Sequence, residues 1–308
     1  MGRMNRKKKK KWPWIVGIPA VLLLAIAAYV LMVYLDFTKT VKDIYEPIDR
    51  DVSGKRDVPV VFDKADPFSV LVLGVDEREG DSGRSDTMIV LTVNPETNST
   101  KMVSIPRDTY TEMVGRGFKD KLNHAYAFGG IEMAMESVEN LLDIPIDYVV
   151  QVNMESFKDI VDAVGGVNIN NSLDFKQGKH IFPKGNIHLN GDEALAFIRM
   201  RYEDPRGDFG RQDRQKQIIE AVLREGASVS SILNYKSIFG AISNNIRTNM
   251  TFDEMVDVQK NYRKAAGNVE QLYIKDGQGQ KMNGIWYYIM NDNELDQIQG
   301  ELRTHLGL

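Results

Sequence analysis

The sequence predicts an α/β fold behind a single N-terminal transmembrane helix. From residue 67 onward, short apolar runs bounded by Pro or Gly alternate with segments of helical periodicity, which is typical of layered α/β domains. Residues 12–35 carry no charge, and seven Lys and Arg precede them in residues 1–11. We therefore divide the chain into a basic tail (1–11), a membrane span (12–35), a stalk (36–66) and a globular domain (67–308).

The uncharged run is long enough to cross a membrane. At about 1.5 Å per residue it exceeds the roughly 30 Å hydrocarbon core, and Trp12 and Tyr34 near its ends suit the headgroup region. A cleaved signal peptide would be shorter and would end in small residues, whereas this run ends in Val-Tyr-Leu-Asp. Because Lys and Arg favour the cytoplasmic side, we expect a single-pass type II protein of the cell membrane with its domain outside the cytoplasm.

Composition restricts the partners of the domain. The chain has 39 basic and 43 acidic residues, and without the seven basic residues of the tail the remainder carries a formal charge of −11. A general nucleic-acid binder would be basic, so we expect no nucleic-acid partner. The chain has no cysteine, so the domain must rely on its core rather than on disulfides, and it is large enough to do so.

The domain is predicted to open with three strands. Residues 68–74, 87–93 and 101–105 are rich in strand formers, and turn residues at 94–99 make the last two a hairpin. Asp76 falls at the carboxyl end of the first strand. The later elements are expected in this order: a helix at 131–142, a strand at 148–152, helices at 156–164, at 190–198 and from 211, helices at 229–246 and 252–266, strands at 271–274 and 285–290, and a helix at 293–305.

Residues 199–215 are the main candidate for a binding site. Arginine is the side chain best suited to phosphate, because its planar fork donates two parallel hydrogen bonds. Two glycines in the segment let backbone approach a ligand. The segment contains Arg199, Arg201, Arg206, Gly207, Gly210, Arg211 and Arg214.

The spacing of these residues directs several of them to one place. On an extended segment Arg199 and Arg201 project to the same side. On the helix that follows, the N-terminus favours anions, and we expect one face to carry Arg211, Arg214 and Gln215 and to continue into the core through Ile218 and Val222. The alternative is that these arginines form surface salt bridges with Glu203, Asp204 and Asp213.

A second group of charged residues borders the predicted strands. It comprises Asp76, Arg84, Asp86 and Arg107. Ligand sites in open α/β sheets favour the carboxyl ends of strands, so we expect these side chains at one edge of the sheet. Two carboxylates with phosphate oxygens would suit Mg²⁺ or Mn²⁺, although Asp76 and Asp86 could instead cap loops.

Other catalytic motifs are incomplete. Gly80-Asp-Ser-Gly83 lacks the third glycine of a serine-hydrolase loop, and Gly277-Gln-Gly-Gln is interpreted as a turn rather than a phosphate loop. The histidines have neither a triad-like context nor zinc-ligand spacing. They are His124, His180, His188 and His305.

Several separated motifs together resemble the LytR-CpsA-Psr family of cell-wall enzymes, and most closely its teichoic-acid-attaching members. The resemblance runs from about Phe68 to the end of the helix at 211–223. The motifs are Leu73-Gly-Val-Asp-Glu-Arg78, Gly83-Arg-Ser-Asp-Thr87, Ser104-Ile-Pro-Arg-Asp108, Lys121-Leu-Asn-His-Ala-Tyr126, Val164-Gly-Gly-Val167, Arg199-Met-Arg-Tyr, Asp208-Phe-Gly-Arg211 and Arg214-Gln215.

The resemblance implies an α-β-α sandwich around a central mixed sheet. It also implies a phosphotransferase that moves a glycopolymer phosphate from an undecaprenyl-pyrophosphate carrier to a peptidoglycan hydroxyl, with the lipid tail in an apolar pocket. The implied metal ligands are Asp76 and Asp86, and the implied supporting or catalytic residues include Asp208. The implied pyrophosphate-binding residues are Arg84, Arg107, Lys121, Arg199, Arg201, Arg211 and Gln215.

The chemistry of pyrophosphate cleavage agrees with these residues. Arginines and Mg²⁺ neutralise charge on the transferred and leaving phosphates, with Arg107 among the catalytic residues. The attacking hydroxyl must lose a proton, and we expect Asp76 rather than Asp86 to accept it. Two other functions remain open: a hydrolase of lipid-linked pyrophosphates, and a non-enzymatic envelope regulator. The acidic domain outside the cytoplasm argues against a regulator that contacts DNA.

Overall fold

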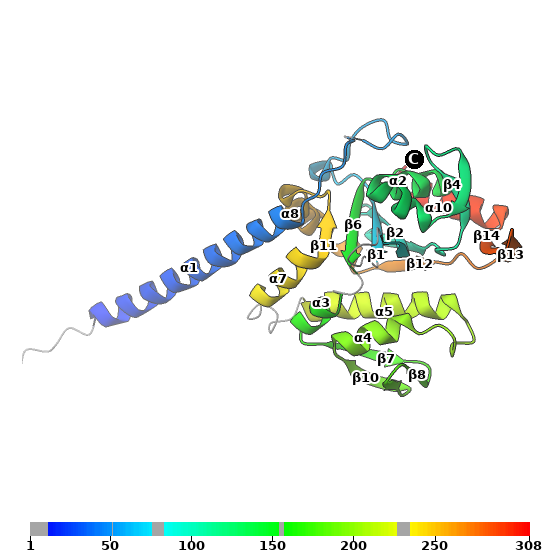
Figure 1. The fold of residues 1–308 in the computed structure, drawn as a ribbon. Coiled ribbons are helices and arrows are strands. Elements are labelled where there is room, and N and C mark those ends of the chain that lie inside the picture. Colours follow the sequence, from blue (N-terminus) through cyan, green and yellow to red (C-terminus); the bar gives the residue numbers. More distant parts are fainter. Residues whose placement is uncertain (1–11, 51, 76–82, 154–156, 227–234) are drawn as a thin grey trace, which may run out of the picture.

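The computed structural model describes residues 12–308 apart from 51, 76–82, 154–156 and 227–234, and it describes only the backbone of 12–25 and of a few other helical residues, Asp208 among them. A long helix, α1 (Trp12–Ile44), precedes a layered domain (Figure 1). Over the described residues, no helix combines the length and the hydropathy that crossing a membrane requires. The span at 12–35 stays a prediction.

The domain is built on a six-stranded mixed sheet with the order β11-β6-β1-β2-β3-β12. The predicted hairpin is the antiparallel pair β2 and β3, and β1 lies antiparallel to β2 and parallel to β6. The mixed α/β fold with a central mixed sheet is thereby confirmed. The strands are β1 (Phe68–Val75), β2 (Ser85–Asn94), β3 (Ser99–Ser104), β6 (Tyr148–Asn153), β11 (Ile246–Thr248) and β12 (Val269–Leu272).

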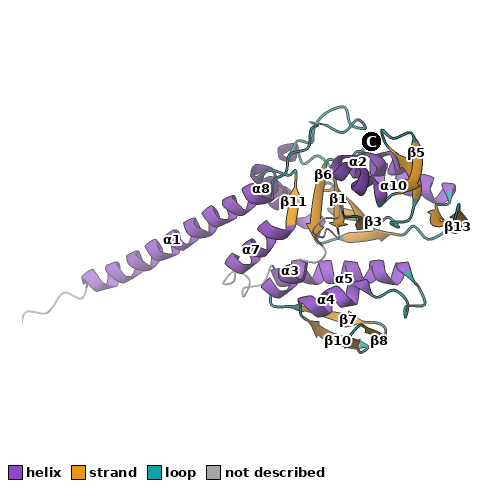
Figure 2. Cartoon of the chain, viewed as in Figure 1, coloured by secondary structure: helices purple, strands orange, loops and turns teal. Residues whose placement is uncertain are grey.

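Helices cover both faces of this sheet (Figures 1 and 2). On one face, Leu71 and Leu73 of β1 belong to a core cluster with side chains of α2 and α10. The alternate residues Val72 and Gly74 point to the other face, where α3, α4 and α5 lie. The helices after α1 are α2 (His124–Leu142), α3 (Phe157–Ala163), α4 (Gly191–Arg199), α5 (Asp208–Gly226), α7 (Tyr235–Asn245), α8 (Phe252–Asn261), α9 (Arg263–Ala266) and α10 (Asp292–Leu306), with a short 3₁₀ turn η1 (Phe62–Lys64).

In the described part of the chain, four two-stranded sheets accompany the central sheet. Most of their strands were not predicted, because they are short and largely polar, and residues 277–280 were interpreted as a turn although Gln278–Met282 form a strand. The paired strands are β4 (Tyr110–Met113) with β5 (Phe118–Lys121), β7 (Val167–Asn171) with β10 (Gly185–Leu189), β8 (Phe175–Gln177) with β9 (His180–Phe182), and β13 (Gln278–Met282) with β14 (Ile285–Ile289).

Three helix boundaries differ from the prediction for local reasons. Helix α2 begins at His124 rather than 131 because it continues across a kink at Gly129 and Gly130, where Gly130 has φ +64°. The predicted helix at 252–266 is interrupted at Tyr262, which has non-helical backbone angles. Helix α5 begins at Asp208, three residues before the predicted start.

Residues 45–66 pack against the domain. Arg50 forms a bidentate ion pair with Glu139 of α2, and Arg56 forms one with Asp147. Phe62 is buried in an aromatic cluster with Phe68, Tyr148 and Tyr262. The segment after α1 is therefore fixed to the sheet by ion pairs and by burial of one aromatic ring.

Candidate active site

An apolar cavity of about 300 Å³ lies between the sheet and helices α3–α5. Its size is at the lower end of ligand pockets, which are roughly 300–1,000 Å³. Two lining side chains are polar, Thr87 and Gln215, and they bond to each other through Gln215 Nε2 and Thr87 Oγ1 at 2.9 Å. The lining residues are Val72, Gly74, Thr87, Ile89, Leu91, Met102, Val150, Val152, Phe157, Ile160, Ile198, Gln215, Ile219, Val222 and Ile246.

The polar end of the cavity lies beside a β-bulge. Gly74 pairs with Thr87 and Val75 pairs with Ser85, so Asp86 is the extra residue of β2 and has no partner on β1. Bulges redirect side chains and are common next to active sites. Thr87 faces the cavity, whereas Asp86 contacts Asn123 just before α2, on the other side of the sheet. The bulge therefore places a carboxylate at the sheet edge between the two faces.

Asp86 is joined there by the predicted Arg107. Their side chains form an ion pair with 2.7 Å between Arg107 Nη1 and Asp86 Oδ2. Arg107 Nε lies 3.7 Å from Asp108, whose carboxylate also accepts a 2.7 Å bond from Lys121 Nζ. The structure thus brings together Asp86 and Arg107, which the sequence placed at one sheet edge, and links them through Asp108 to Lys121, which only the family resemblance had implied.

The cavity-facing side of α5 connects the apolar lining to a charged end. Gln215, Ile219 and Val222 line the cavity, and Arg211 stands one turn before Gln215 in the first turn of the helix. Arg211 is buried, at 8% exposure. The first turn of α5 is therefore one turn away from Gln215, a polar residue of the cavity lining. Free backbone N–H groups at such a helix start favour an anion.

Arg199 and Arg201 lie at the end of α4, next to the same cavity. Ile198 lines the cavity, Arg199 is exposed, and Met200 is buried at 1% exposure between the two arginines. Arg199 and Arg201 therefore follow the lining residue Ile198 closely in sequence, and Arg211 precedes the lining residue Gln215 by one helical turn. We refer to Arg107, Arg199, Arg201 and Arg211 as the mouth arginines.

Arg206 and Arg214, by contrast, form an ion-pair cluster with Asp204 and Asp213, in which Arg214 and Asp204 are buried and Arg206 is exposed. Arg214 Nη1 is 2.6 Å from Asp204 Oδ2, its other nitrogens donate to the carbonyls of Phe197 and Met200, and its guanidinium lies over the Phe175 ring. Arg206 pairs with both Asp204 and Asp213. The salt-bridge alternative is therefore correct for these two arginines.

The helix face predicted for α5 needs a correction for the same reason. Ile218, expected to continue the ligand-facing stripe, is fully buried in a second core cluster that also contains Phe197 and Met200. Arg214 lies one turn before Ile218 and faces this cluster, whereas Gln215, Ile219 and Val222 face the cavity. Positions 214 and 215 are adjacent in sequence, but a helix rotates about 100° per residue and separates them.

Burial and hydrogen bonding oppose each other at Asp204. Burial alone would raise the pKa of its carboxyl, but bonds from the Arg206 backbone N–H and from the Arg214 and Arg206 guanidinium groups lower the pKa below its usual value. Gly210 is required beside this carboxylate, because a Cβ at position 210 would overlap it. Desolvation lowers the pKa of Arg214, against the effect of Asp204.

The structure describes three other predicted site residues to different extents. Arg84 is exposed directly before β2, one residue from the Asp86 bulge. The prediction for Asp76 lies outside the described residues, and for Asp208 only the backbone, at the start of α5, is described. The catalytic and metal-binding roles predicted for Asp76 and Asp208 stay predictions.

The Asp86 region is compatible with a divalent cation. In the part of the chain that the structure describes, no three acidic, His or Cys side chains form a metal cluster. Asp86 is nevertheless 37% exposed, and the neighbouring Asn123 Oδ1 is a buried oxygen with no hydrogen-bond partner among the described residues. Mg²⁺ binds through one or two carboxylates together with phosphate oxygens, so this donor set is suitable when substrate completes it.

One acid–base pair escaped the sequence analysis. His124 Nδ1 lies 2.8 Å from Asp120 Oδ2, and Tyr287 donates to the other oxygen of the same carboxylate. Burial would raise the pKa of Asp120, but the bond from His124 and others lower it. The i, i+4 spacing of Asp120 and His124 was a usable signal, whereas Tyr287 comes from the distant strand β14.

Known proteins are similar to this chain in sequence and in structure. The LytR_cpsA_psr family matches residues 31–304. A polyisoprenyl-teichoic acid–peptidoglycan teichoic acid transferase, TagU, from Bacillus cereus is 51% identical and covers 97% of this chain and 98% of its own. The crystal structure of Bacillus subtilis TagU has a TM-score of 0.63 at 50% identity and covers 78% of this chain and 97% of its own. TagT bound to LIIa-WTA has a TM-score of 0.73 at 32% identity and covers 86% of this chain and 100% of its own.

Proposed function

The chain belongs to the LytR-CpsA-Psr family, and from this premise we propose that it transfers a glycopolymer phosphate, wall teichoic acid, from an undecaprenyl-pyrophosphate carrier to peptidoglycan. The observation that carries the proposal is an apolar cavity whose two polar lining residues are close to charged ones: Thr87 follows Asp86, which pairs with Arg107, and Gln215 lies one turn after Arg211. A lipid-linked pyrophosphate likewise consists of an apolar chain joined to a charged group. The relatives named as teichoic acid transferases, and the one solved with LIIa-WTA, support this substrate class.

The residues have distinct roles in the proposed reaction. The lipid tail lies in the cavity, and the pyrophosphate lies against the mouth arginines, Arg84, Lys121 and Gln215. Arginine forks bind the non-bridging oxygens and neutralise charge that grows on the leaving phosphate. A divalent cation held by Asp86 and Asp76 would supply further charge neutralisation there.

The transfer breaks one P–O bond and forms another. The acceptor hydroxyl oxygen attacks the phosphorus that carries the glycopolymer, and the bond to the bridging oxygen breaks, so undecaprenyl phosphate leaves. The hydroxyl proton passes to a carboxylate, for which we propose Asp76, while Arg107 and Asp208 support the reacting groups. The product is a phosphodiester between the polymer and peptidoglycan.

The proposed topology follows from the N-terminal sequence. An uncharged run behind a lysine-rich tail would hold the domain at the outer face of the cell membrane, close to a lipid-borne donor and a wall-borne acceptor. A reporter fused after Leu308 tests this, and a cytoplasmic signal from the reporter would refute the arrangement.

The experiment for the activity uses the full chain in detergent with a labelled lipid-pyrophosphate donor, with and without peptidoglycan. We expect label to become attached to peptidoglycan. Label that appears only as free phosphorylated product while peptidoglycan is plentiful would instead identify a hydrolase. No change in the donor under either condition would favour a non-enzymatic role.

A further inference from the structure

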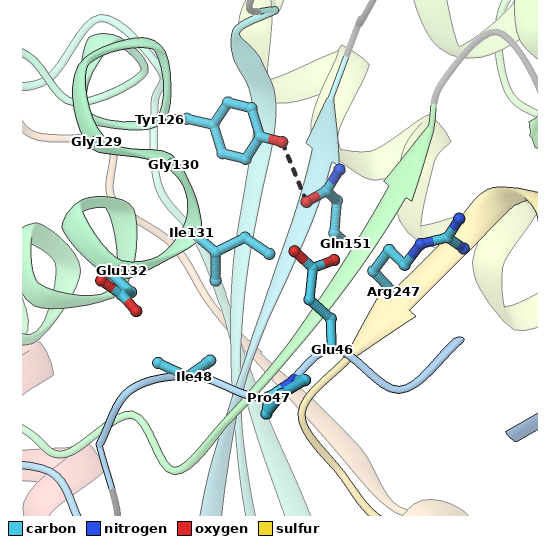
Figure 3. A pocket seen from close by; sticks show the side chains of 10 residues that line it. All are labelled: Glu46, Pro47, Ile48, Tyr126, Gly129, Gly130, Ile131, Glu132, Gln151 and Arg247. Atoms are coloured by element: carbon cyan, nitrogen blue, oxygen red, sulfur yellow. Dashed lines mark hydrogen bonds between the residues drawn. The ribbon is translucent and has the colours of Figure 1, made fainter. Parts of the chain in front are cut away.

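A second hollow, polar rather than apolar, lies on the opposite face of the sheet. It has a volume of about 400 Å³ and is bounded by residues 46–48, the start of α2, β6 and β11. Figure 3 shows the Tyr126 hydroxyl bonded to Gln151, with the Glu46 carboxylate directed towards the same space. Glu132 and Arg247 complete its charged lining.

The hollow opens on the same side of the sheet as Asp86. Gln151 pairs with Leu73, and Leu73 pairs with Met88, so these three residues form one row across the sheet. Strands lie about 4.8 Å apart, which places Gln151 on the order of 10 Å from Met88, two residues along β2 from Asp86. The connection through α2 is equally short, because Asn123 contacts Asp86 and Tyr126 follows three residues later.

The two hollows are separated by the sheet itself. Val150 and Val152, which flank Gln151 on β6, line the apolar cavity on the other face. A lipid-linked donor in that cavity and a molecule in the polar hollow would therefore reach the edge at Asp86 and Arg107 from opposite sides. Such an approach matches a reaction that joins two large substrates.

The lining chemistry favours a saccharide over the other molecules of the reaction. Carboxylate, amide, phenol and guanidinium groups offer both donors and acceptors, which suits sugar hydroxyls and N-acyl groups. Glu46 and Glu132 outnumber Arg247, so the hollow would repel a polymer rich in phosphate. The carboxylates would also be costly to bury against a lipid tail.

Two lining side chains are held in place by hydrogen bonds to the backbone and have further hydrogen-bonding groups. Glu132 Oε1 accepts a 3.3 Å bond from the Asp49 backbone, and Arg247 Nη1 donates to the carbonyls of Ser243 and Ile246. Glu46 and Glu132 are exposed. The side chains that already have a backbone partner, Glu132 and Arg247, bind a ligand with less ordering cost than free ones.

We propose that this hollow is the acceptor subsite and binds the amino-sugar backbone of peptidoglycan. The inference rests on the proposed function, because it assigns the second substrate of the same reaction. Its consequence is that the acceptor affinity and the donor affinity depend on separate sets of residues on the two faces of the sheet.

The test measures both substrates separately in the full chain. Tyr126→Phe removes a hydroxyl and Glu132→Gln replaces a charged acceptor with a neutral amide, and Glu136→Gln is the matched control, because Glu136 is exposed one turn further along α2 and does not line the hollow. We expect the KM for a soluble disaccharide-peptide fragment of peptidoglycan to rise roughly three- to tenfold in the first two variants, the loss of about one hydrogen bond. The donor KM, and both constants in the control, should stay unchanged.

Direct binding of the same fragment, measured by calorimetry, separates this inference from the proposed function. Weaker binding in Tyr126→Phe and Glu132→Gln supports the subsite even if transfer itself is not observed. Unchanged fragment binding in both variants overturns the subsite, whether or not the wild-type chain transfers polymer. A parallel rise in the donor KM would also overturn it, since the effect would then not be specific to the acceptor.

Discussion

Arg211 and Arg214 stand three residues apart on α5, and their surroundings differ completely. Arg214 is held by Asp204 and by the carbonyls of Phe197 and Met200 inside a core cluster, whereas Arg211 precedes the cavity-lining residue Gln215 by one turn. Arg214 also fixes the backbone of Met200, between Arg199 and Arg201. One arginine-rich segment thus contains both an arginine for which we propose ligand binding and an arginine that holds the surrounding backbone in place.

The largest effect should come from the mouth arginines. We expect Arg107→Ala or Arg199→Ala to lower transfer by at least roughly 10²–10³-fold, because each removes a preorganised donor to the reacting phosphates. The melting temperature should change little, since Arg199 is exposed and the Arg107–Asp86 pair is partly exposed. Transfer and thermal unfolding are measured on the same preparations.

Arg263→Ala is the matched control for these variants, as an exposed arginine of α9 away from the cavity lining. It should leave transfer unchanged. Wild-type activity in both mouth variants would mean that the site has been assigned to the wrong place.

Arg214→Ala should act on stability instead. It leaves the Asp204 carboxylate, whose side chain is 1% exposed, without its buried guanidinium partner and with only the exposed Arg206 beside it. Removing one member of a buried pair costs about 3–5 kcal/mol, and urea unfolding would show this as a lower midpoint. An unchanged midpoint together with lost transfer would assign Arg214 to the mouth and break the comparison.

The same contrast continues one turn further along α5. The larger ring in Ile219→Trp should occupy part of the apolar cavity. Each methylene group of the donor that is excluded from the cavity costs about 0.8 kcal/mol of binding free energy. Exclusion of a few methylene groups is therefore enough for a tenfold rise in the KM of a long-chain donor. A donor with a short chain should be much less affected. Equal losses for long-chain and short-chain donors would argue against a lipid-binding cavity.

Ile218→Trp provides the opposite result at the adjacent position. Ile218 is fully buried in the second core cluster, so the larger ring should overpack it and destabilise the fold by about 1–3 kcal/mol. Chemical denaturation of the two variants side by side distinguishes the faces. Equal loss of stability in both would mean that the cavity is too small to accept a side chain.

The smallest effect should be on how the free energy of unfolding decreases at acid pH. The pKa of Asp204 is lowered in the folded protein, so its ionised form contributes stability above the unfolded pKa of about 3.9, and this contribution is lost as pH falls through the folded pKa. In Asp204→Asn the free energy of unfolding at neutral pH should be lower than in the wild type. The part of its decrease at acid pH that comes from protonation of Asp204 should be absent. Parallel pH profiles for both proteins would show that Asp204 does not titrate as the ion pair requires.

The sequence predicted the elements that have strong local signals. The apolar runs of β1, β2 and β3 and the start of α4 near residue 190 are set by short-range patterns, and the structure contains them. The sequence could not assign Arg214 and Gln215 to different faces of α5, because the packing of Phe197 and Met200 decides which face of the helix is buried. It also missed β4, β5 and β13, whose side chains are partly polar and gain their order from pairing.

Local patterns by themselves determined the family motifs, the arginine-rich segment, the acidic domain and the uncharged N-terminal run, because each lies within a few consecutive residues. Only the tertiary structure decided that Thr87 faces an apolar cavity while Asp86, its neighbour, lies on a bulge towards α2. It likewise decided which arginines are bound by Asp204. These outcomes depend on register and on side chains far apart in sequence, whose contacts form only when the sheet and its two helical layers come together.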